Sequence, residues 1–296
     1  MRLVLGSALL LATPMATGAM ARDMGPRDVD ALPASKPTAL VSYGTDRLQT
    51  GELRLPAGKG PFPVAVVIHG GCWTKGFATA RNTAPLASAL TAKGIATWNI
   101  EYRQVGDAGG GWPGTFADWA AATDHLRTLA KRYPIDLTNV VVTGHSAGAH
   151  AALWVAARGK LPKGNALRGS NPLPVRAAVA IDGPGDLAPF VGPDAEICGK
   201  PVIVPLMGGT PAEVPGRYAQ GSPAALLPLG MPQVMLPSSV LTPDAAEAYR
   251  KAAVAKGDRA SVVPTAAGAD HFNIIAPGEP QFEPTLRAIL DALGRR

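Results

Sequence analysis

The stretch Val140-Val141-Val142-Thr143-Gly144-His145-Ser146-Ala147-Gly148 decides the fold of this chain. A run of residues with high strand propensity leads into a Gly-x-Ser-x-Gly box, and a helix-compatible run over 147–158 follows it. A serine at the apex of a sharp strand-to-helix turn needs small residues two positions to either side, because the turn leaves no room for larger side chains. The pattern therefore predicts a nucleophile elbow at Ser146. The competing interpretation is a glycine-rich turn with an incidental serine.

The chain on both sides of the box alternates between apolar runs and helical patterns. Two strands that look antiparallel are followed by repeated strand-helix units, which favours an α/β fold with a mostly parallel sheet of about eight strands and helices on both faces. The expected strands are 39–43, 51–55, 64–69, 95–101, 140–143, 177–181, 233–236 and 261–264. The expected helices are 82–93, 115–132, 146–158, 243–256 and 283–293.

Two stretches lack any clear period. Residues 159–175 and 183–230 are rich in Gly and Pro, and we interpret them as loops over the carboxyl edge of the sheet, where ligands of such folds bind. Residues 22–38 are rich in Pro, Asp and Ala and suggest an extended N-terminal arm. A single domain is expected over 39–296, since 296 residues hold no internal repeat.

The N-terminus carries an export signal. A basic start is followed by an apolar run and then by Ala19-Met20-Ala21, which is a pattern typical of a secretory signal peptide over residues 1–21. The apolar run is too short for a stable membrane anchor. We therefore expect a secreted or periplasmic protein. The net charge of +6 comes without a Lys/Arg cluster, so no nucleic-acid partner is expected.

The chain has two cysteines, Cys72 and Cys198. An even count in an exported chain permits a disulfide, and two buried free thiols are the alternative. A bridge between them would tie the long stretch 183–230 to the loop that contains Cys72. No Cys-x-x-Cys pair or His/Cys cluster indicates a metal site.

A serine hydroxyl is a poor nucleophile until a base takes its proton, and in this architecture the base comes late in the chain. Four of the five histidines are unsuited, because they precede the serine, lie in its box or fall one turn into the next helix: His69, His125, His145 and His150. His271 follows the last expected strand, where a loop can bring its imidazole to the elbow. His271 is therefore the predicted base, and a surface-loop histidine is the alternative.

Attack on an ester or amide places negative charge on the carbonyl oxygen, which backbone N–H groups must meet. One donor is the amide of Ala147, the residue after the serine. The loop after the third expected strand contains His69-Gly70-Gly71-Cys72-Trp73, whose paired glycines let the backbone turn its amides toward a ligand. Gly71 and Cys72 are therefore the other predicted donors, and we interpret His69 as a hydrogen-bonding residue that fixes the loop.

These motifs resemble those of α/β-hydrolases of the esterase/lipase group that carry His-Gly-Gly-x-Trp, which includes feruloyl-esterase-like proteins and kynurenine formamidases. The matching segments are 69–73, 98–103, 109–116, 144–148 and 270–272. The resemblance implies an α/β-hydrolase fold, a Ser-His-acid triad and hydrolysis of a small-molecule carboxylic ester or aryl amide without a cofactor.

The acid of the triad is the point at which this chain departs from the pattern. Such hydrolases follow the seventh strand with His-Gly and then an aspartate a few residues on, whereas here no carboxylate occurs after 233–236 until Asp244. Asp182, which ends the sixth expected strand, is the alternative, and Asp186 is a poorer form of the same idea. Asp244 is favoured over Asp182 because it follows the strand that usually supplies the acid.

Two charged residues flank Tyr102 at the end of an expected strand. We interpret Glu101 and Arg103 as a salt bridge with each other, and contact with substrate is the alternative.

The leading hypothesis is a secreted serine esterase with Ser146, His271 and Asp244 as its triad. The alternatives are an amidase or peptidase with the same site, and a binding protein of this fold that has lost the usual acid.

Overall fold

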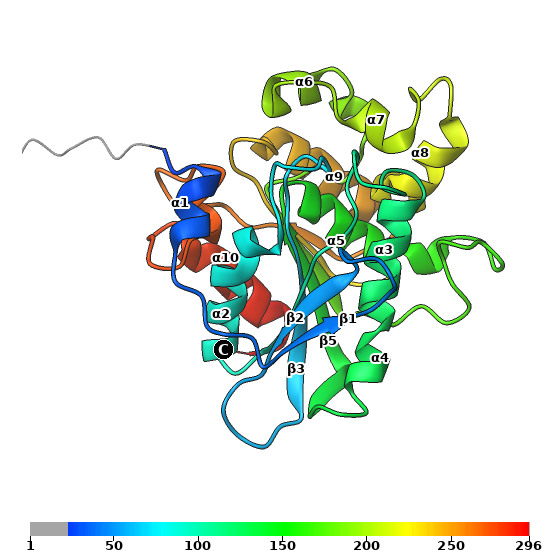
Figure 1. The fold of residues 1–296 in the computed structure, drawn as a ribbon. Helices are drawn as coiled ribbons and strands as arrows, with labels where there is room; N and C mark the ends of the chain where they lie inside the picture. The colour runs from blue at the N-terminus through cyan, green and yellow to red at the C-terminus, as the bar shows by residue number, and fades with distance from the viewer. Residues whose placement is uncertain (1–22, 296) are drawn as a thin grey trace, which may run out of the picture.

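The computed structural model describes residues 23–295, so the predicted signal peptide over 1–21 lies outside the described residues. A single twisted sheet runs through the molecule, with helices on both of its faces (Figure 1). The α/β architecture expected from the sequence, a sheet with helices on both faces, is confirmed. No helix within 23–295 is long and apolar enough to cross a bilayer.

The sheet has eight strands in the order β1-β2-β4-β3-β5-β6-β7-β8. β1 and β2 pair antiparallel, β2 and β4 pair antiparallel, and every other pair is parallel. The strands are β1 (Ala39–Ser42), β2 (Thr50–Arg54), β3 (Phe62–Ile68), β4 (Ala96–Ile100), β5 (Ile135–His145), β6 (Ala177–Ile181), β7 (Gln233–Leu236) and β8 (Ala260–Val262). All eight lie where the sequence predicts strands, although β5 begins earlier than expected.

Two hydrophobic cores lie on opposite faces of the sheet. Because successive side chains of a strand point to opposite faces, Val64, Val66 and Ile68 of β3 belong to one core, and Ala65 and Val67 belong to the other. The first core is covered by α3 (Gly114–Asp124), α5 (Ala147–Ala157) and α9 (Pro243–Ala255). The second is covered by α2 (Ala84–Ala92) and α10 (Phe282–Ala292). The predicted helix 115–132 is two helices, α3 and α4 (Leu126–Leu129).

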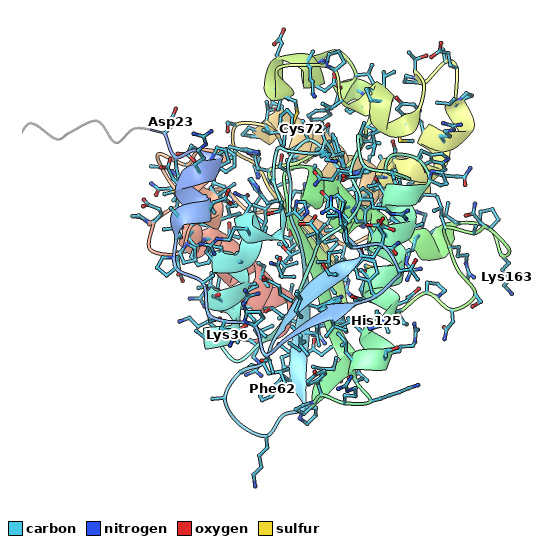
Figure 2. All side chains as sticks on the ribbon, in the orientation of Figure 1. Asp23, Lys36, Phe62, Cys72, His125 and Lys163 are labelled. Atoms are coloured by element: carbon cyan, nitrogen blue, oxygen red, sulfur yellow. A yellow bond between two sulfur atoms is a disulfide. The ribbon has the colours of Figure 1, made fainter. Side chains whose placement is uncertain are left out.

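The stretch 183–230 is not simply a loop. It contains α6 (Pro193–Cys198), α7 (Ile203–Met207) and α8 (Pro215–Gly221), together with short 3-10 turns at Ala188–Phe190 and Pro223–Leu226. These helices form a cap over the carboxyl ends of the parallel strands, at the top of Figure 1. In Figure 2, Cys72 lies below the cap, near the carboxyl ends of the parallel strands, and Phe62 lies at the opposite end, at the start of β3.

The N-terminal arm is also more ordered than its predicted extended form. It contains α1 (Pro26–Ala31), whose Val29 is fully buried in the second core. Asn82 donates to the carbonyl of Pro26 and to Asp30, and Arg81 donates to the carbonyl of Leu32. These contacts hold the arm against the start of α2.

Candidate active site

The predicted elbow has the expected geometry. Ser146 lies between the end of β5 and the start of α5, with a φ of 57°. The glycines of the box are required by close approach, because a Cβ on Gly148 would lie 2.1 Å from the Ile68 carbonyl oxygen. A Cβ on Gly144 would lie equally close to the Gly148 carbonyl oxygen, at 2.1 Å. Only glycine fits at either position, so the serine is held at the apex.

Backbone strain is concentrated at this place. In residues 23–295, the non-glycine residues with positive φ are Cys72, Trp73, Ser146 and Asp182. Left-handed conformations of this kind cost energy and persist only where the surrounding structure enforces them. All of them follow the carboxyl ends of parallel strands, β3, β5 and β6, which converge on one edge of the sheet.

Asp182 and His271 form a buried pair. Nδ1 of His271 lies 2.7 Å from Oδ2 of Asp182, and the side chain of Asp182 is fully buried. The other carboxylate oxygen accepts the amides of Ser238 and Leu241, each at 2.8 Å, and the amide of Val240 at 3.2 Å. Burial acts to raise the pKa of Asp182, but the hydrogen bond and charge of His271 and the Leu241 amide outweigh it and hold the pKa below its ordinary value.

The structure thus places the alternative acid, Asp182, and not the favoured Asp244, beside His271. Asp244 is exposed in the first turn of α9, and the acid beside the imidazole is Asp182 at the end of β6. The connection after β7 holds no carboxylate over 237–242, and it donates backbone amides to the carboxylate of the neighbouring strand. Asp186 accepts the amide of Ala188, two residues on.

His145 holds the loop that carries His271. Nε2 of His145 donates to the carbonyl oxygen of His271 at 2.6 Å, and the two ring centroids are 4.3 Å apart. Burial, together with repulsion from His271, lowers the pKa of His145 to about 3, so the ring is neutral at ordinary pH. The residue inside the serine box thus fixes the backbone of the histidine loop. The sequence showed His145 only as a variable position, and its partner was not predictable from local spacing.

The loop after β3 is fixed by the polar side chains that the sequence had singled out. His69 contacts Glu101 through Nε2 at 2.8 Å and the Gly70 carbonyl through Nδ1 at 2.8 Å. The ring also stacks on Tyr102, whose hydroxyl donates to the His69 carbonyl. The interpretation of His69 as a residue that fixes the loop is consistent with these contacts.

Glu101 and Arg103 do not pair with each other. Glu101 pairs with His69 and accepts the amides of Ala80 and Tyr102, whereas Arg103 pairs with buried Asp118. Burial acts to raise the pKa of Glu101, but the charge and hydrogen bond of His69 bring it below its ordinary value. The two side chains leave the end of β4 in different directions, so each finds its own partner.

The predicted oxyanion donors face the same place as the serine. Gly71, Cys72 and Ser146 line one cavity, and Cys72, Ser146 and Ala147 line a second, smaller one. Among the hydrogen bonds of residues 23–295 outside the regular helices and strands, none uses the amide of Gly71, Cys72 or Ala147. These amides are therefore available to a ligand at Ser146.

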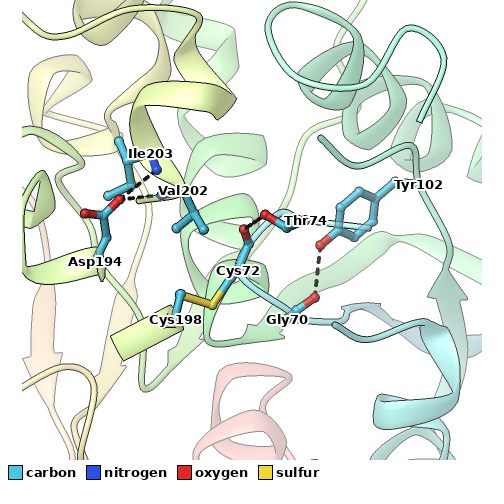
Figure 3. The surroundings of a disulfide bond; sticks show 8 residues. All are labelled: Gly70, Cys72, Thr74, Tyr102, Asp194, Cys198, Val202 and Ile203. Atoms are coloured by element: carbon cyan, nitrogen blue, oxygen red, sulfur yellow. Dashed lines mark hydrogen bonds between the residues drawn. A yellow bond between two sulfur atoms is a disulfide. The ribbon is translucent and has the colours of Figure 1, made fainter. Parts of the chain in front are cut away.

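Cys72 and Cys198 form a disulfide, with Cα atoms 6.2 Å apart and 126 positions apart in the chain. Figure 3 shows the bridge joining the loop after β3 to the end of α6. Nearby, the buried carboxylate of Asp194 accepts the amides of Val202 and Ile203, each at 2.8 Å. The cap is thus attached covalently to the strained loop, and Asp194 of α6 holds the backbone at the start of α7.

The larger cavity has a volume of about 460 Å³ and is lined by both Ser146 and His271. Its walls are mostly apolar and include Phe77, Ile197 and Phe272. Pro26 of the N-terminal arm also lines it, and the amide of Met24 donates to Asp270, the neighbour of His271, at 2.9 Å. The residues described contain no group of three or more His, Cys, Asp or Glu side chains that could hold a metal ion.

Comparison with known proteins shows which family the chain resembles. The model of the BD-FAE family matches residues 52–237, which is more than half of the chain. A search of curated protein sequences found no match.

Several solved structures share the fold. A truncated carbohydrate esterase from gut microbiota is 21% identical with a TM-score of 0.72, and the match covers 89% of this chain and 99% of that one. A bifunctional GH43-CE protein of Bacteroides eggerthii is 23% identical with a TM-score of 0.69, covering 86% of this chain and 37% of that one. Esterase 2 of Thermogutta terrifontis is 19% identical with a TM-score of 0.66, covering 88% and 96%.

The order of the motifs, the geometry of the elbow and the family match all point to the same fold and family. The chain belongs to the BD-FAE family, a family of α/β-hydrolase esterases, and is a carboxylic ester hydrolase.

Proposed function

We propose that the chain is an exported serine esterase in which Ser146 is the nucleophile, His271 the general base and Asp182 the acid. Ser146 attacks the ester carbonyl while Nε2 of His271 takes the hydroxyl proton. The amides of Ala147 and of Cys72 or Gly71 stabilise the oxyanion. His271 then protonates the leaving alcohol, and water hydrolyses the acyl-enzyme by the same route.

The observation that carries this proposal is the pair of Asp182 and His271, whose 2.7 Å contact supports one tautomer of the imidazole. With Nδ1 bonded to the carboxylate, Nε2 is left to exchange a proton in the cavity that Ser146 also lines. The Ser146 hydroxyl makes no hydrogen bond to the described residues, and such contacts commonly close only when substrate binds.

Two alternatives differ in how well they fit. A binding protein that lacks the acid is disfavoured, because the carboxylate of Asp182 lies beside the imidazole of His271, where an acid of the triad would be needed. An amidase remains compatible with the same groups, since the constellation serves both leaving groups. Esterase 2 of Thermogutta terrifontis, which shares the fold, has been captured phosphonylated by sarin, the type of adduct that an activated serine forms.

The test is a comparison of Ser146→Ala with Ser239→Ala, because both serines line the larger cavity. Ser146→Ala should lower kcat on a chromogenic ester by about 10⁴-fold or more, leaving the contribution of binding and the oxyanion site. It should also abolish labelling by a fluorophosphonate, which Ser239→Ala should retain. Near-normal hydrolysis by folded Ser146→Ala would end the proposal, and parallel assays on an ester and its anilide distinguish esterase from amidase.

A further inference from the structure

Two cavities meet at Ser146, and His271 lines only one of them. The larger, of about 460 Å³, contains both residues on its wall. The smaller, of about 20 Å³, is lined by Ser146 together with Ala147, Cys72 and Trp73, without His271. The side chains around the nucleophile are therefore divided between a wide space and a narrow one.

The chemistry of ester cleavage assigns the two spaces, and this step depends on the proposed function. The leaving oxygen must receive its proton from His271, so the alcohol part of the ester belongs in the larger cavity. The carbonyl oxygen faces the amides of Cys72 and Ala147. The acyl substituent is left with the direction away from His271, into the smaller cavity. A volume of about 20 Å³ holds little more than one water-sized group, so it accepts a very short acyl chain.

An apolar groove shares a wall with the smaller cavity. It has a volume of about 270 Å³ and runs along α9, where Ala245, Ala248 and Tyr249 line it. Adjacent residues contribute to the two spaces on either side of the wall: Pro184 and Val240 line the smaller cavity, and their neighbours Gly185 and Leu241 line the groove.

One side chain belongs to both spaces. Among the described residues, Phe190 alone lines the smaller cavity and the groove. It ends the 3-10 turn Ala188–Phe190 and is half-buried against the first core. Asp186 is the charged residue of the groove, and its carboxylate accepts the amide of Ala188.

We propose that Phe190 sets the acyl-chain limit of this enzyme by closing the smaller cavity against the groove along α9. With the ring in place, the acyl group ends at Phe190, and only short chains fit beside Ser146. Without the ring, the two spaces join into one apolar channel that reaches α9, and a straight acyl chain can extend into it.

The test compares p-nitrophenyl acetate with p-nitrophenyl octanoate on the full mature chain. Phe190→Ala should raise the ratio of kcat/KM for octanoate over acetate by about tenfold or more, since each methylene that finds an apolar site adds binding energy. Phe190→Leu is the matched control, because a branched side chain still fills most of the opening, and its ratio should change by much less. Ala248 is an exposed residue of α9 that lines the groove. Adding Ala248→Trp to Phe190→Ala should fill the groove again and return the ratio toward that of the wild type.

Each outcome decides the matter. Folded Phe190→Ala that keeps acetate hydrolysis with an unchanged ratio overturns the inference, and so does an equal loss on both esters, which would mean that Phe190 only supports the site. A gain on octanoate that Ala248→Trp does not reduce also overturns it, because the chain would then lie elsewhere. A wild-type protein that hydrolyses neither ester and resists a fluorophosphonate would instead refute the proposed function, and the inference with it.

Discussion

Two connections leave neighbouring strands at the same edge of the sheet, and they differ in length and in what they contribute to the site. The connection after β6 is long: it begins with Asp182, builds the cap and returns to the sheet at β7. The connection after β7 spans only 237–242 before α9, and it carries no acid. One supplies the carboxylate, and the other supplies the backbone amides that surround it.

The position of an acid beside the histidine is therefore a property of the whole site and not of one particular strand. β6 and β7 are paired, so their ends lie side by side and either can reach an imidazole between them. A carboxylate that is fully buried needs several donors, and amides at the start of a short loop supply them without any side chain. The absence of an acid after β7 and the burial of Asp182 are thus two parts of one arrangement.

Removing each candidate acid in turn tests which of the two connections supplies the acid, and it should give the largest effect. Asp182→Asn should lower kcat by up to about 10⁴-fold, because an amide cannot stabilise the imidazolium and favours the wrong tautomer. Asp244→Asn should change kcat less than twofold, since Asp244 is exposed on α9. Steady-state kinetics on a chromogenic ester, with circular dichroism to check folding, measure both. The assignment of the acid fails if Asp244→Asn is the crippled variant.

The disulfide offers a second way to separate the two connections, because it attaches only the longer one to the loop after β3. The paired change Cys72→Ser and Cys198→Ser opens a covalent loop with a sequence separation of 126, and it should lower the free energy of unfolding by about 4 kcal/mol. Urea unfolding of the variant and the wild type, both without reductant, measures the difference. Equal unfolding midpoints and slopes would show that the cap is held without the bridge.

A smaller effect should come from His150, whose Nε2 donates to the carbonyl of Gly221 at the end of α8. Burial lowers the pKa of His150 from its ordinary value of 6.5 to about 4. Between these values the unfolded chain binds a proton that the folded chain excludes, so stability falls as the pH drops from 6.5 toward 4. The loss amounts to up to about 3 kcal/mol.

The measurement is the free energy of unfolding of wild type and His150→Gln across that range. Glutamine keeps an N–H donor but does not titrate. The free energy of unfolding of His150→Gln should therefore depend less steeply on pH, by the slope that corresponds to about one proton. Buried His145 has a pKa lowered in the same direction, so a residual slope remains in both proteins. Parallel curves for the two proteins would contradict the neutral, buried state of His150.

Much of the fold was predictable because its central strands are continuous apolar runs. The predicted bounds of β6 and β7 agree with the structure, since Ala177–Ile181 is buried along its whole length. β5 begins at Ile135, before the apolar run, because Asp136 carries no apolar signal yet pairs with Pro63 of β3. The cap helices were missed because α6, α7 and α8 are too short to show a helical period.

The site divides in the same way. Ser146, His271 and the oxyanion loop follow from local motifs and from chain order. The partner of His271 does not, because it depends on how the loop after β7 folds back over β6, a contact between residues 56 to 59 positions apart. The role proposed for Phe190 could not be predicted either, since it depends on two spaces that exist only in the folded chain.

The two ends of the chain have different practical value. The first described residues lie beside the larger cavity, where Pro26 is part of the wall and the Met24 amide donates to Asp270, the neighbour of His271. At the other end, Arg295 donates to the carbonyl of Gly94, which precedes β4 at the opposite edge of the sheet (Figure 1). A purification tag or a linker to a solid support therefore belongs at the C-terminus, where it leaves the route of the ester open.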